Sequence, residues 1–407
     1  MGRNVPTPPA APIPPDDAAR DVLRLTLIPG LGPVRIARLI EAFGSAGRVL
    51  GASESALTRV RGVGRQTAQT IARQRDATAD RVERELDLAR SLGVRLLALG
   101  DRAYPPLLAA IPNPPPILYV RGEIDQAQDR FPVAIVGSRG CSAYGVEQAE
   151  RFAGWLASAG LTVVSGGARG VDTAAHRAAV RLGGRTIAVL GSGLAEPYPP
   201  ENRPFFDEVA SGRGAVVSEL PLTTPPAAEN FPMRNRIISG LSLGVLIVEA
   251  AVGSGALITA RHATEDHGRE VMALPGRVDS PASAGANDLL KRGGAHLVTD
   301  PKDVLDLLES PARHLHAGVH AARYADPARA RPEPGDDPDA PGDHDGLDAL
   351  LTDQQRAIVA ALDRPMVLDE LARRLGLPAE RLLTEVTVLE IRGRVARVGS
   401  TLTRRDG

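Results

Sequence analysis

The sequence predicts an α/β fold in which a doubly wound parallel sheet forms the central domain between two smaller, largely helical domains. Between residues 131 and 308, short apolar runs at 133–136, 161–164 and 186–190 alternate with segments of helical length. Runs rich in valine and isoleucine and bounded by turn residues are typical of buried parallel strands in βαβ units. Further runs at 244–249 and 270–274 continue the pattern.

Glycine-rich loops follow these strand candidates and predict an anion-binding edge. The loops are 137–140 (Gly-Ser-Arg-Gly), 165–172 (Ser-Gly-Gly-Ala-Arg-Gly-Val-Asp), 191–193 (Gly-Ser-Gly) and 253–255 (Gly-Ser-Gly). Ligands of open parallel sheets bind at the carboxyl ends of the strands, so the loops should meet at one edge. Glycine lets backbone N–H groups approach a guest, and the following helix adds its positive end. We therefore expect phosphate there, beside Arg139 and Arg169.

Composition limits the function classes. A chain of 407 residues suits two or three domains. The formal net charge of -1 excludes a uniformly basic nucleic-acid binder, so an anion site must come from local clusters. The single cysteine, Cys141, excludes a disulfide framework and a cysteine metal site. Residues 1–15 are proline-rich without a signal-peptide core, and no run reaches membrane length, so we expect a cytoplasmic protein without membrane contact.

The N-terminal region predicts a disordered tail at 1–20 and a helix-hairpin-helix (SAM-like) domain at 21–95. A hydrophobic-Gly-hydrophobic-Gly turn opens an amphipathic helix near residue 30 and again near residue 62. In that motif the turn offers N–H groups to a DNA phosphate. Residues 24–75 hold nine arginines against two acids, Glu41 and Glu54, which suits a polyanion. A small helical packing domain without DNA contact is the alternative.

The central stretch lacks known catalytic and cofactor signatures. Neither a dinucleotide fingerprint nor a P-loop is present. Asp172 and His176 have the spacing of an acid/base pair, but a helix N-cap with the histidine packed beneath it is the simpler interpretation. We interpret His314, His316 and His320 as solvated residues of a linker. We therefore predict no catalytic residue, no metal ligand and no cofactor.

A second cluster lies at residues 230–242, just before the strand candidate at 244–249. Phe231 can stack on an unpaired base, while Arg234 and Arg236 can neutralise phosphates, a combination that suits single-stranded nucleic acid. In the alternative interpretation, Phe231 belongs to the core and both arginines form ion pairs with nearby glutamates.

Together these motifs resemble the DNA processing protein A (DprA/Smf) family. The matching segments are 136–139 (Val-Gly-Ser-Arg), the loop at 165–172, 231–241 (Phe-Pro-Met-Arg-Asn-Arg-Ile-Ile-Ser-Gly-Leu), 254–260 (Ser-Gly-Ala-Leu-Ile-Thr-Ala), and Pro275-Gly276 followed by Gly285-Ala-Asn287. They keep the family's order over residues 96 to 308. Ala286 departs from the pattern, because a small polar residue is expected there.

The resemblance implies an extended Rossmann-like core at 96–309 that binds single-stranded DNA without catalysis. It also implies a homodimer that protects incoming strands in natural transformation and loads a RecA-type recombinase, with single-strand-binding protein as a further candidate partner. The DNA-binding residues carried over by matching motif are Gly137, Ser138, Arg139, Ser165, Gly166, Gly167, Arg169, Phe231, Arg234, Asn235, Arg236, Thr259 and Asn287.

The C-terminal region predicts a disordered, acidic and proline-rich linker at 310–349 and a winged-helix domain at 350–407. Helices are expected at 352–362, 368–375 and 377–392, with a hairpin at 395–403. The third helix carries Glu380, Glu385 and Glu390, which repel phosphate. Contact with double-stranded DNA through the terminal domains and contact with proteins both stay open.

A different class of function is also compatible with a glycine-rich sheet edge. A nucleotide-processing enzyme, such as a nucleoside monophosphate phosphoribohydrolase, would use Asp172 and Glu249 as acid/base groups. The chain lacks the Pro-Gly-Gly-x-Gly-Thr-x-x-Glu loop of that class.

Overall fold

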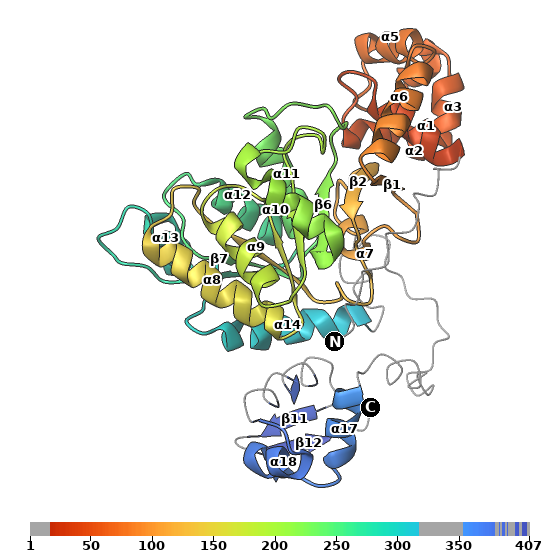
Figure 1. Cartoon of the computed structure of the whole chain (residues 1–407). Coiled ribbons are helices and arrows are strands. Elements are labelled where there is room, and N and C mark those ends of the chain that lie inside the picture. Colours follow the sequence, from red (N-terminus) through yellow and green to blue (C-terminus); the bar gives the residue numbers. More distant parts are fainter. Residues whose placement is uncertain are drawn as a thin grey trace, which may run out of the picture.

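The computed structural model of this chain describes residues 17–316, 353–378, 382, 385–386, 389, 395–398 and 401–404. Figure 1 shows an N-terminal helical domain, a central domain around a sheet, and a small C-terminal domain. No helix among these residues has the length and apolar character that crossing a bilayer requires.

Within the described residues, the central domain contains a nine-stranded sheet of order β1-β2-β6-β5-β4-β3-β7-β8-β9. The strands are β1 (Val94–Ala98), β2 (Ile117–Gly122), β3 (Pro132–Val136), β4 (Thr162–Ser165), β5 (Thr186–Val189), β6 (Gly214–Ser218), β7 (Gly244–Ile247), β8 (Glu270–Ala273) and β9 (His296–Leu297). All neighbours from β6 to β9 pair in parallel, whereas β2 pairs antiparallel with β6 and β1 pairs antiparallel with β2. The predicted doubly wound α/β core is confirmed.

The winding of the chain creates a switch point in the middle of the sheet. From β3 the chain moves outward through β4, β5 and β6, then returns to place β7 on the other side of β3 and continues to β8. Crossovers on the two sides therefore cover opposite faces of the sheet, and the loops after β3 and β7 diverge. Ligands of open α/β sheets bind at this kind of crevice.

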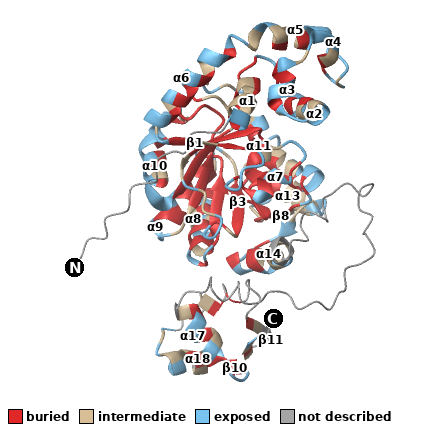
Figure 2. Ribbon diagram, turned by 90° about the vertical axis from the view of Figure 1, so that its right-hand side faces the viewer, coloured by how far each residue is buried: buried red, intermediate tan, exposed pale blue. Residues whose placement is uncertain are grey.

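Helices cover both faces of the sheet because its strands are apolar on both sides. One face packs against α8 (Ala143–Ser158), α9 (Val171–Arg181) and α14 (Pro301–His316), and the other against α7 (Pro106–Ala109), α11 (Asn230–Gly240), α12 (Gly255–Arg261) and α13 (Ala284–Lys291). Figure 2 shows the strands as a continuous buried layer between them. Fully buried side chains such as Phe152 and Ile237 each contribute roughly 1.5–3 kcal/mol through the hydrophobic effect.

Shorter helical segments complete the central domain. They are η1 (Pro200–Asn202), α10 (Arg203–Glu208) and η2 (Val209–Arg213), with η3 (His262–Asp266) continuing α12. Phe205 and Phe206 of α10 belong to a buried cluster that also contains Tyr119 of β2 and Leu23 and Leu27 of the N-terminal domain. This cluster joins the N-terminal domain to the central one.

The N-terminal domain contains the predicted pair of helix-hairpin-helix turns. Its helices are α1 (Asp17–Thr26), α2 (Pro33–Phe43), α3 (Ala46–Gly51), α4 (Glu54–Leu57), α5 (Arg65–Gln74) and α6 (Thr78–Ser91). Gly30 and Gly62 adopt φ values of 75° and 86°, which favour glycine, just before α2 and α5. Arg35 Nη1–H donates to Gly30 O at 2.7 Å and its Nε–H to Gly62 O at 3.2 Å, so one side chain links the two turns.

The C-terminal domain shows the predicted winged-helix elements. They are α17 (Asp353–Ala361), β10 (Met366–Val367), α18 (Leu368–Leu375), β11 (Val395–Val398) and β12 (Thr401–Arg404), with sheet order β10-β12-β11. Gly376 ends α18 in the left-handed conformation. Of the predicted third helix, residues 382, 385–386 and 389 are helical, Leu377 and Pro378 are not, and the other residues lie outside the described part of the chain. Residue 352, the expected start of the first helix, also lies outside it.

Two expected domain boundaries were wrong by a few residues. Helix α1 begins at Asp17, inside the predicted tail, because Ala19 and Leu23 are buried against the rest of the protein. Helix α14 continues to His316, inside the predicted linker, because Ala312 packs into the same cluster as Leu308. His314 and His316 therefore belong to a helix, whereas residue 320, the rest of the tail and the rest of the linker lie outside the described residues.

Candidate nucleic-acid interface

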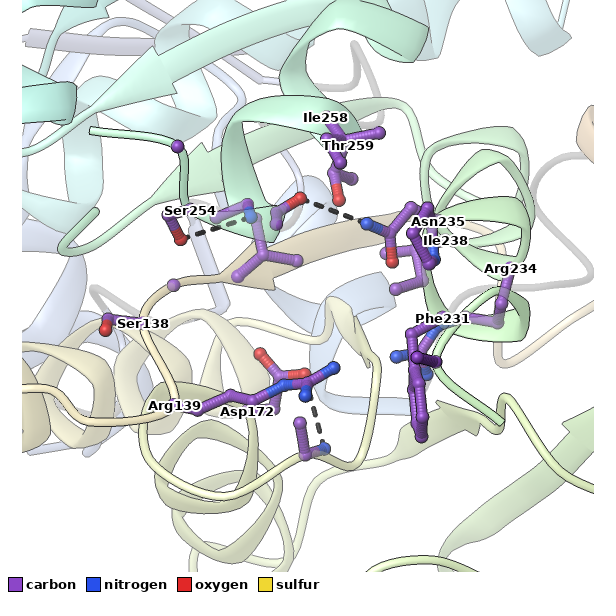
Figure 3. A pocket seen from close by; sticks show the side chains of 18 of the residues that line it. Ser138, Arg139, Asp172, Phe231, Arg234, Asn235, Ile238, Ser254, Ile258 and Thr259 are labelled. Atoms are coloured by element: carbon purple, nitrogen blue, oxygen red, sulfur yellow. Dashed lines mark hydrogen bonds between the residues drawn. The ribbon is translucent and has the colours of Figure 1, made fainter. Parts of the chain in front are cut away.

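A cleft of about 750 Å³ opens at the switch point between β3 and β7 (Figure 3). The loop after β3, the loop after β7 and the first turns of α11 and α12 contribute to its walls. Six of the predicted site residues line this cleft together with the buried Arg234. They are Gly137, Ser138, Arg139, Phe231, Asn235 and Thr259.

The backbone of the loop after β3 is fixed by close packing. A Cβ at Gly137 would lie 2.5 Å from Val171 Cγ2 and 2.9 Å from Glu249 O, so only glycine fits there. Ser138 N–H donates to Glu249 O at 2.7 Å. The loop is held against β7 and α9, and the next side chain, Arg139, extends into solvent at the cleft.

Arg139 and Phe231 meet across the cleft. The Arg139 Cζ atom lies 4.7 Å from the centroid of the Phe231 ring, within cation–π distance. Arg139 is exposed and Phe231 is half-buried at the start of α11. Figure 3 shows the arginine reaching from the loop after β3 toward the aromatic ring. A cation and an aromatic face thus lie side by side on residues that are 92 positions apart in the sequence.

Arg234 lines the cleft, but its guanidinium group is buried and bound by other groups of the protein. Its side chain is only 4% exposed, and Nη1–H groups donate to Gly166 O and Val189 O. Burial lowers the pKa of Arg234 to about 10, while the nearby Asp172 carboxylate favours its charged form. Arg234 therefore holds the ends of β4 and β5 together beneath the cleft.

Asp172 faces Arg234 and does not cap α9. The N-cap is Gly170, without a side-chain capping bond, and Asp172 lies in the first turn, where its Oδ2 accepts from Ala168 N–H at 3.3 Å. Burial raises the pKa of Asp172, and the Arg234 charge opposes that rise. The N-cap interpretation was wrong.

The loop after β4 also supports the cleft from below. Ser165 is fully buried and donates from Oγ to Ile135 O at 2.6 Å. A Cβ at Gly166 would come within 2.6 Å of Asp172 Oδ2 and 2.7 Å of Arg234 Nη2. Gly167 has a φ of 65° and packs near Phe206. These three predicted contact residues are buried, so they support the shape of the site but are not accessible to a DNA strand.

Two other predicted residues lie away from the cleft walls. Arg236 forms an ion pair with Glu219 in which both side chains are largely buried, as in the alternative interpretation of that arginine. The Asn287 amide is occupied by Gly276, since Oδ1 accepts from Gly276 N–H at 3.0 Å and Nδ2–H donates to Gly276 O at 3.1 Å. Asn235 and Thr259 do line the cleft, although Asn235 Nδ2–H donates to Gly255 O at 3.0 Å.

Tyr198 lines the cleft and was not predicted from the sequence. Its ring centroid lies 5.7 Å from that of Phe231, with the planes tilted by 60°. Arg169 lies behind it, where Nη1–H donates to Tyr198 Oη at 3.0 Å and the other guanidinium nitrogens bind Glu201. The sequence signal was weak, because Tyr198 is a single tyrosine seven residues beyond Gly191. The sequence had pointed only to the glycines of that loop.

The groups required by an enzymatic alternative are engaged in structural contacts. Both Glu249 oxygens accept from Ser142, from its N–H and its Oγ–H, each at 2.7 Å, and Glu249 is 2% exposed. His176 Nδ1 pairs with Thr186 Oγ1 at 2.6 Å, so it makes no acid/base pair with Asp172. Within the described part of the chain, no group of three or more His, Cys, Asp or Glu residues could hold a metal ion.

Comparison with known proteins decides the family. Residues 95–309 match the family model described as DNA recombination-mediator protein A, residues 327–400 match the DprA winged helix domain, and residues 22–75 match the SAM-like helix-hairpin-helix tandem. The chain belongs to the DprA/Smf family of DNA processing proteins.

Individual relatives extend over most of the chain. Protein Smf of Escherichia coli is 40% identical over 307 residues, which are 74% of this chain and 75% of that protein. DNA processing protein DprA of Bacillus subtilis is 36% identical over 235 residues, 58% of this chain and 77% of that protein. The X-ray structure of DprA from Streptococcus pneumoniae matches with a TM-score of 0.62 and 34% identity, over 71% of this chain and 97% of that chain.

The one departure from the DprA/Smf pattern has a simple structural explanation. Ala286 is 1% exposed in the cluster beneath α13, and its N–H donates to Ala250 O at 3.1 Å. Ala286 therefore contacts the loop after β7 through its backbone N–H group, and this contact does not depend on a polar side chain.

Proposed function

We propose that the cleft binds single-stranded DNA and that this protein is a non-catalytic recombination mediator. The observation that carries the proposal is the Arg139–Phe231 pair at the sheet's switch point. Unpaired bases stack on aromatic rings while cations neutralise the backbone, and this combination is typical of single-strand binding without sequence preference. A duplex hides its base faces, so the pair favours unpaired strands.

The remaining cleft residues complete the surface in this proposal. Gly137 and Ser138 place backbone close to the strand, whereas Asn235 and Thr259 are buried in the opposite wall and shape it. Family membership supports DNA processing as the process in which the site acts. Within that process, we propose that the protein protects incoming strands in natural transformation and, as a homodimer, loads a RecA-type recombinase.

The proposal is tested by binding of a labelled oligo-dT to the full chain and to Arg139→Ala over a range of salt concentrations. Each phosphate contact contributes about 0.7 to the slope of log affinity against log salt for a single strand. We expect Arg139→Ala to lower the slope by about that amount and to weaken binding roughly tenfold, as for a lost charged hydrogen bond.

Arg181→Ala is the matched control, because Arg181 is exposed, pairs with Glu150 and lies outside the cleft. It should bind like the wild type. Equal affinity for single strands and duplexes of the same sequence, or an unchanged slope in Arg139→Ala, would refute the proposal.

A further inference from the structure

Tyr198 has the position of a second aromatic platform beside Phe231. The chain has only six phenylalanines, five tyrosines and one tryptophan among 407 residues, yet two of these rings meet at one solvent-accessible cleft. Their separation of 5.7 Å and tilt of 60° fall in the preferred range for aromatic pairs in contact. The rings leave no room for a base between them, so together they form one continuous apolar step.

Arg169 holds Tyr198 in that position. Its Nη1–H donates to the phenol oxygen at 3.0 Å, its Cζ lies 5.4 Å from the tyrosine ring centroid, and Glu201 binds the guanidinium through both carboxylate oxygens. Arg169 and Glu201 come from the loop after β4 and from η1, so the contact ties two loops around the tyrosine. Three guanidinium nitrogens are occupied in this way.

The position of Arg169 argues against a phosphate contact. It is absent from the cleft walls, whereas Tyr198 and Arg139 line them. Its nearest charged partner is a carboxylate, which cancels its charge toward an approaching strand. By contrast, no carboxylate pairs with Arg139 among the described residues' ion pairs, and Arg139 already lies over the aromatic step.

We infer that Tyr198 stacks on a base of the bound strand and that Arg169 is a positioning residue that holds the Tyr198 ring beside Phe231. The Arg169 donor leaves the phenol hydrogen of Tyr198 free to point outward to the strand. In this inference the cleft binds a strand through one cation, Arg139, and two adjacent aromatic rings. This inference rests on the proposed single-strand binding and specifies which residues perform it.

The test separates base stacking from charge. Full-length wild type, Tyr198→Leu, Tyr198→Phe and Arg169→Ala are titrated with oligo-dT and with an abasic oligonucleotide of equal length at several salt concentrations. Tyr198→Leu can no longer stack one base, so it should bind oligo-dT about tenfold more weakly than the wild type. Affinity for the abasic strand and the salt slope should stay unchanged, because no phosphate contact is lost.

The other variants assign the roles. Tyr198→Phe keeps the ring and should bind within about twofold of the wild type. Arg169→Ala should behave like a weaker Tyr198→Leu, with a lower preference for oligo-dT over the abasic strand and an unchanged salt slope. Tyr144→Leu is the matched control, since Tyr144 is a partly exposed tyrosine of α8 outside the cleft. Thermal unfolding of each variant confirms that it is folded.

The outcomes distinguish this inference from the function beneath it. If Tyr198→Leu binds oligo-dT as well as Tyr144→Leu does, the stacking role is overturned. If Arg169→Ala lowers the salt slope as much as Arg139→Ala, Arg169 is a phosphate contact and its positioning role is overturned. If wild type binds neither oligonucleotide, the proposed function itself fails.

Discussion

Two arginines at this cleft differ in their surroundings, because one is exposed and the other is buried. Arg139 is exposed over an aromatic ring, whereas Arg234 is buried against Asp172 and two backbone carbonyl groups. A buried charge is tolerated only when it is paired and hydrogen-bonded. Arg234 therefore contributes to stability, and Arg139 is free for binding.

Replacing Arg234 should destabilise the core strongly. In Arg234→Met, Asp172 stays buried without its cation, which costs about 3–5 kcal/mol of unfolding free energy. Urea unfolding followed by fluorescence of Trp155, the chain's single tryptophan and part of α8, measures this change. Arg181→Met, which removes an exposed ion pair, should change it by less than about 1 kcal/mol. A loss below 1 kcal/mol in Arg234→Met would contradict the structural role.

Acid should destabilise the core through His176. Burial, with Arg234 nearby, lowers the pKa of His176 to about 3. The unfolded chain binds a proton below about pH 6.5 while the folded state does not, so stability is lost as pH falls below 6.5. From pH 7 to pH 5 this histidine should account for about 2 kcal/mol of lost unfolding free energy.

The variant His176→Asn isolates this effect from the other titrating groups, because asparagine can keep a contact with Thr186 but does not titrate. His267, whose pKa burial lowers to about 4, remains in both proteins and cancels from the comparison. Unfolding of wild type and variant at pH 7 and pH 5, again followed by Trp155, gives the difference. Equal pH dependence of the two proteins would show that His176 takes up a proton while folded.

At the scale of elements, the site depends on how loops leave the sheet. Strands β3 and β7 lie next to each other in the sheet although 107 residues separate their ends, Val136 and Gly244. Their loops diverge because their crossovers go to opposite sides of the sheet. The cleft is the space between the loops, and its precision depends on the packing of the loop after β3.

Two glycines of that loop should respond differently to alanine. Gly137→Ala places a methyl group against Val171 and a backbone oxygen, and such overpacking costs about 1–3 kcal/mol. Gly140→Ala meets no atom within 4 Å, and Gly140 has no positive φ, so its stability should change by less than about 0.5 kcal/mol. Thermal unfolding and oligo-dT titration compare the two. Equal losses would show that the loop is not fixed by packing at Gly137.

At the scale of the whole molecule, the N-terminal and central domains share a buried cluster. Leu23 and Leu27 pack with Tyr119, Val216 and Leu222 of the central domain. The buried residues described in the C-terminal domain form a separate cluster around Ile358 and Leu371. Removal of the N-terminal domain should therefore destabilise the central core, whereas removal of the C-terminal domain should not.

Truncation should reveal this difference. A protein of residues 1–316 should keep the Trp155 unfolding midpoint and the oligo-dT affinity of the full chain. A protein that begins at residue 94 should lose about 3 kcal/mol or more, because the partners of two buried leucines become exposed. Urea unfolding and oligo-dT titration of the three proteins test both statements. A stable protein without residues 1–93 would contradict the shared core.

Much of the fold could be predicted because its parallel strands are continuous apolar runs. Strands β3, β4, β5, β7 and β8 were predicted to within a residue or two at each end. Strand β2 was missed because its apolar run follows a proline cluster and pairs antiparallel with β6, almost 100 residues later. Local periodicity carries no information on such pairing.

The sequence by itself determined the domain order, the doubly wound core, the glycine loops and the family, because these depend on local runs of apolar residues and on motifs with fixed spacing. The tertiary structure alone decided which arginines face solvent, that Tyr198 lies beside Phe231, and that Arg169 is bound by Glu201. Residue type sets what a side chain can do. Its burial and its partners come from chain segments far apart in the sequence, and only the packed sheet brings them together.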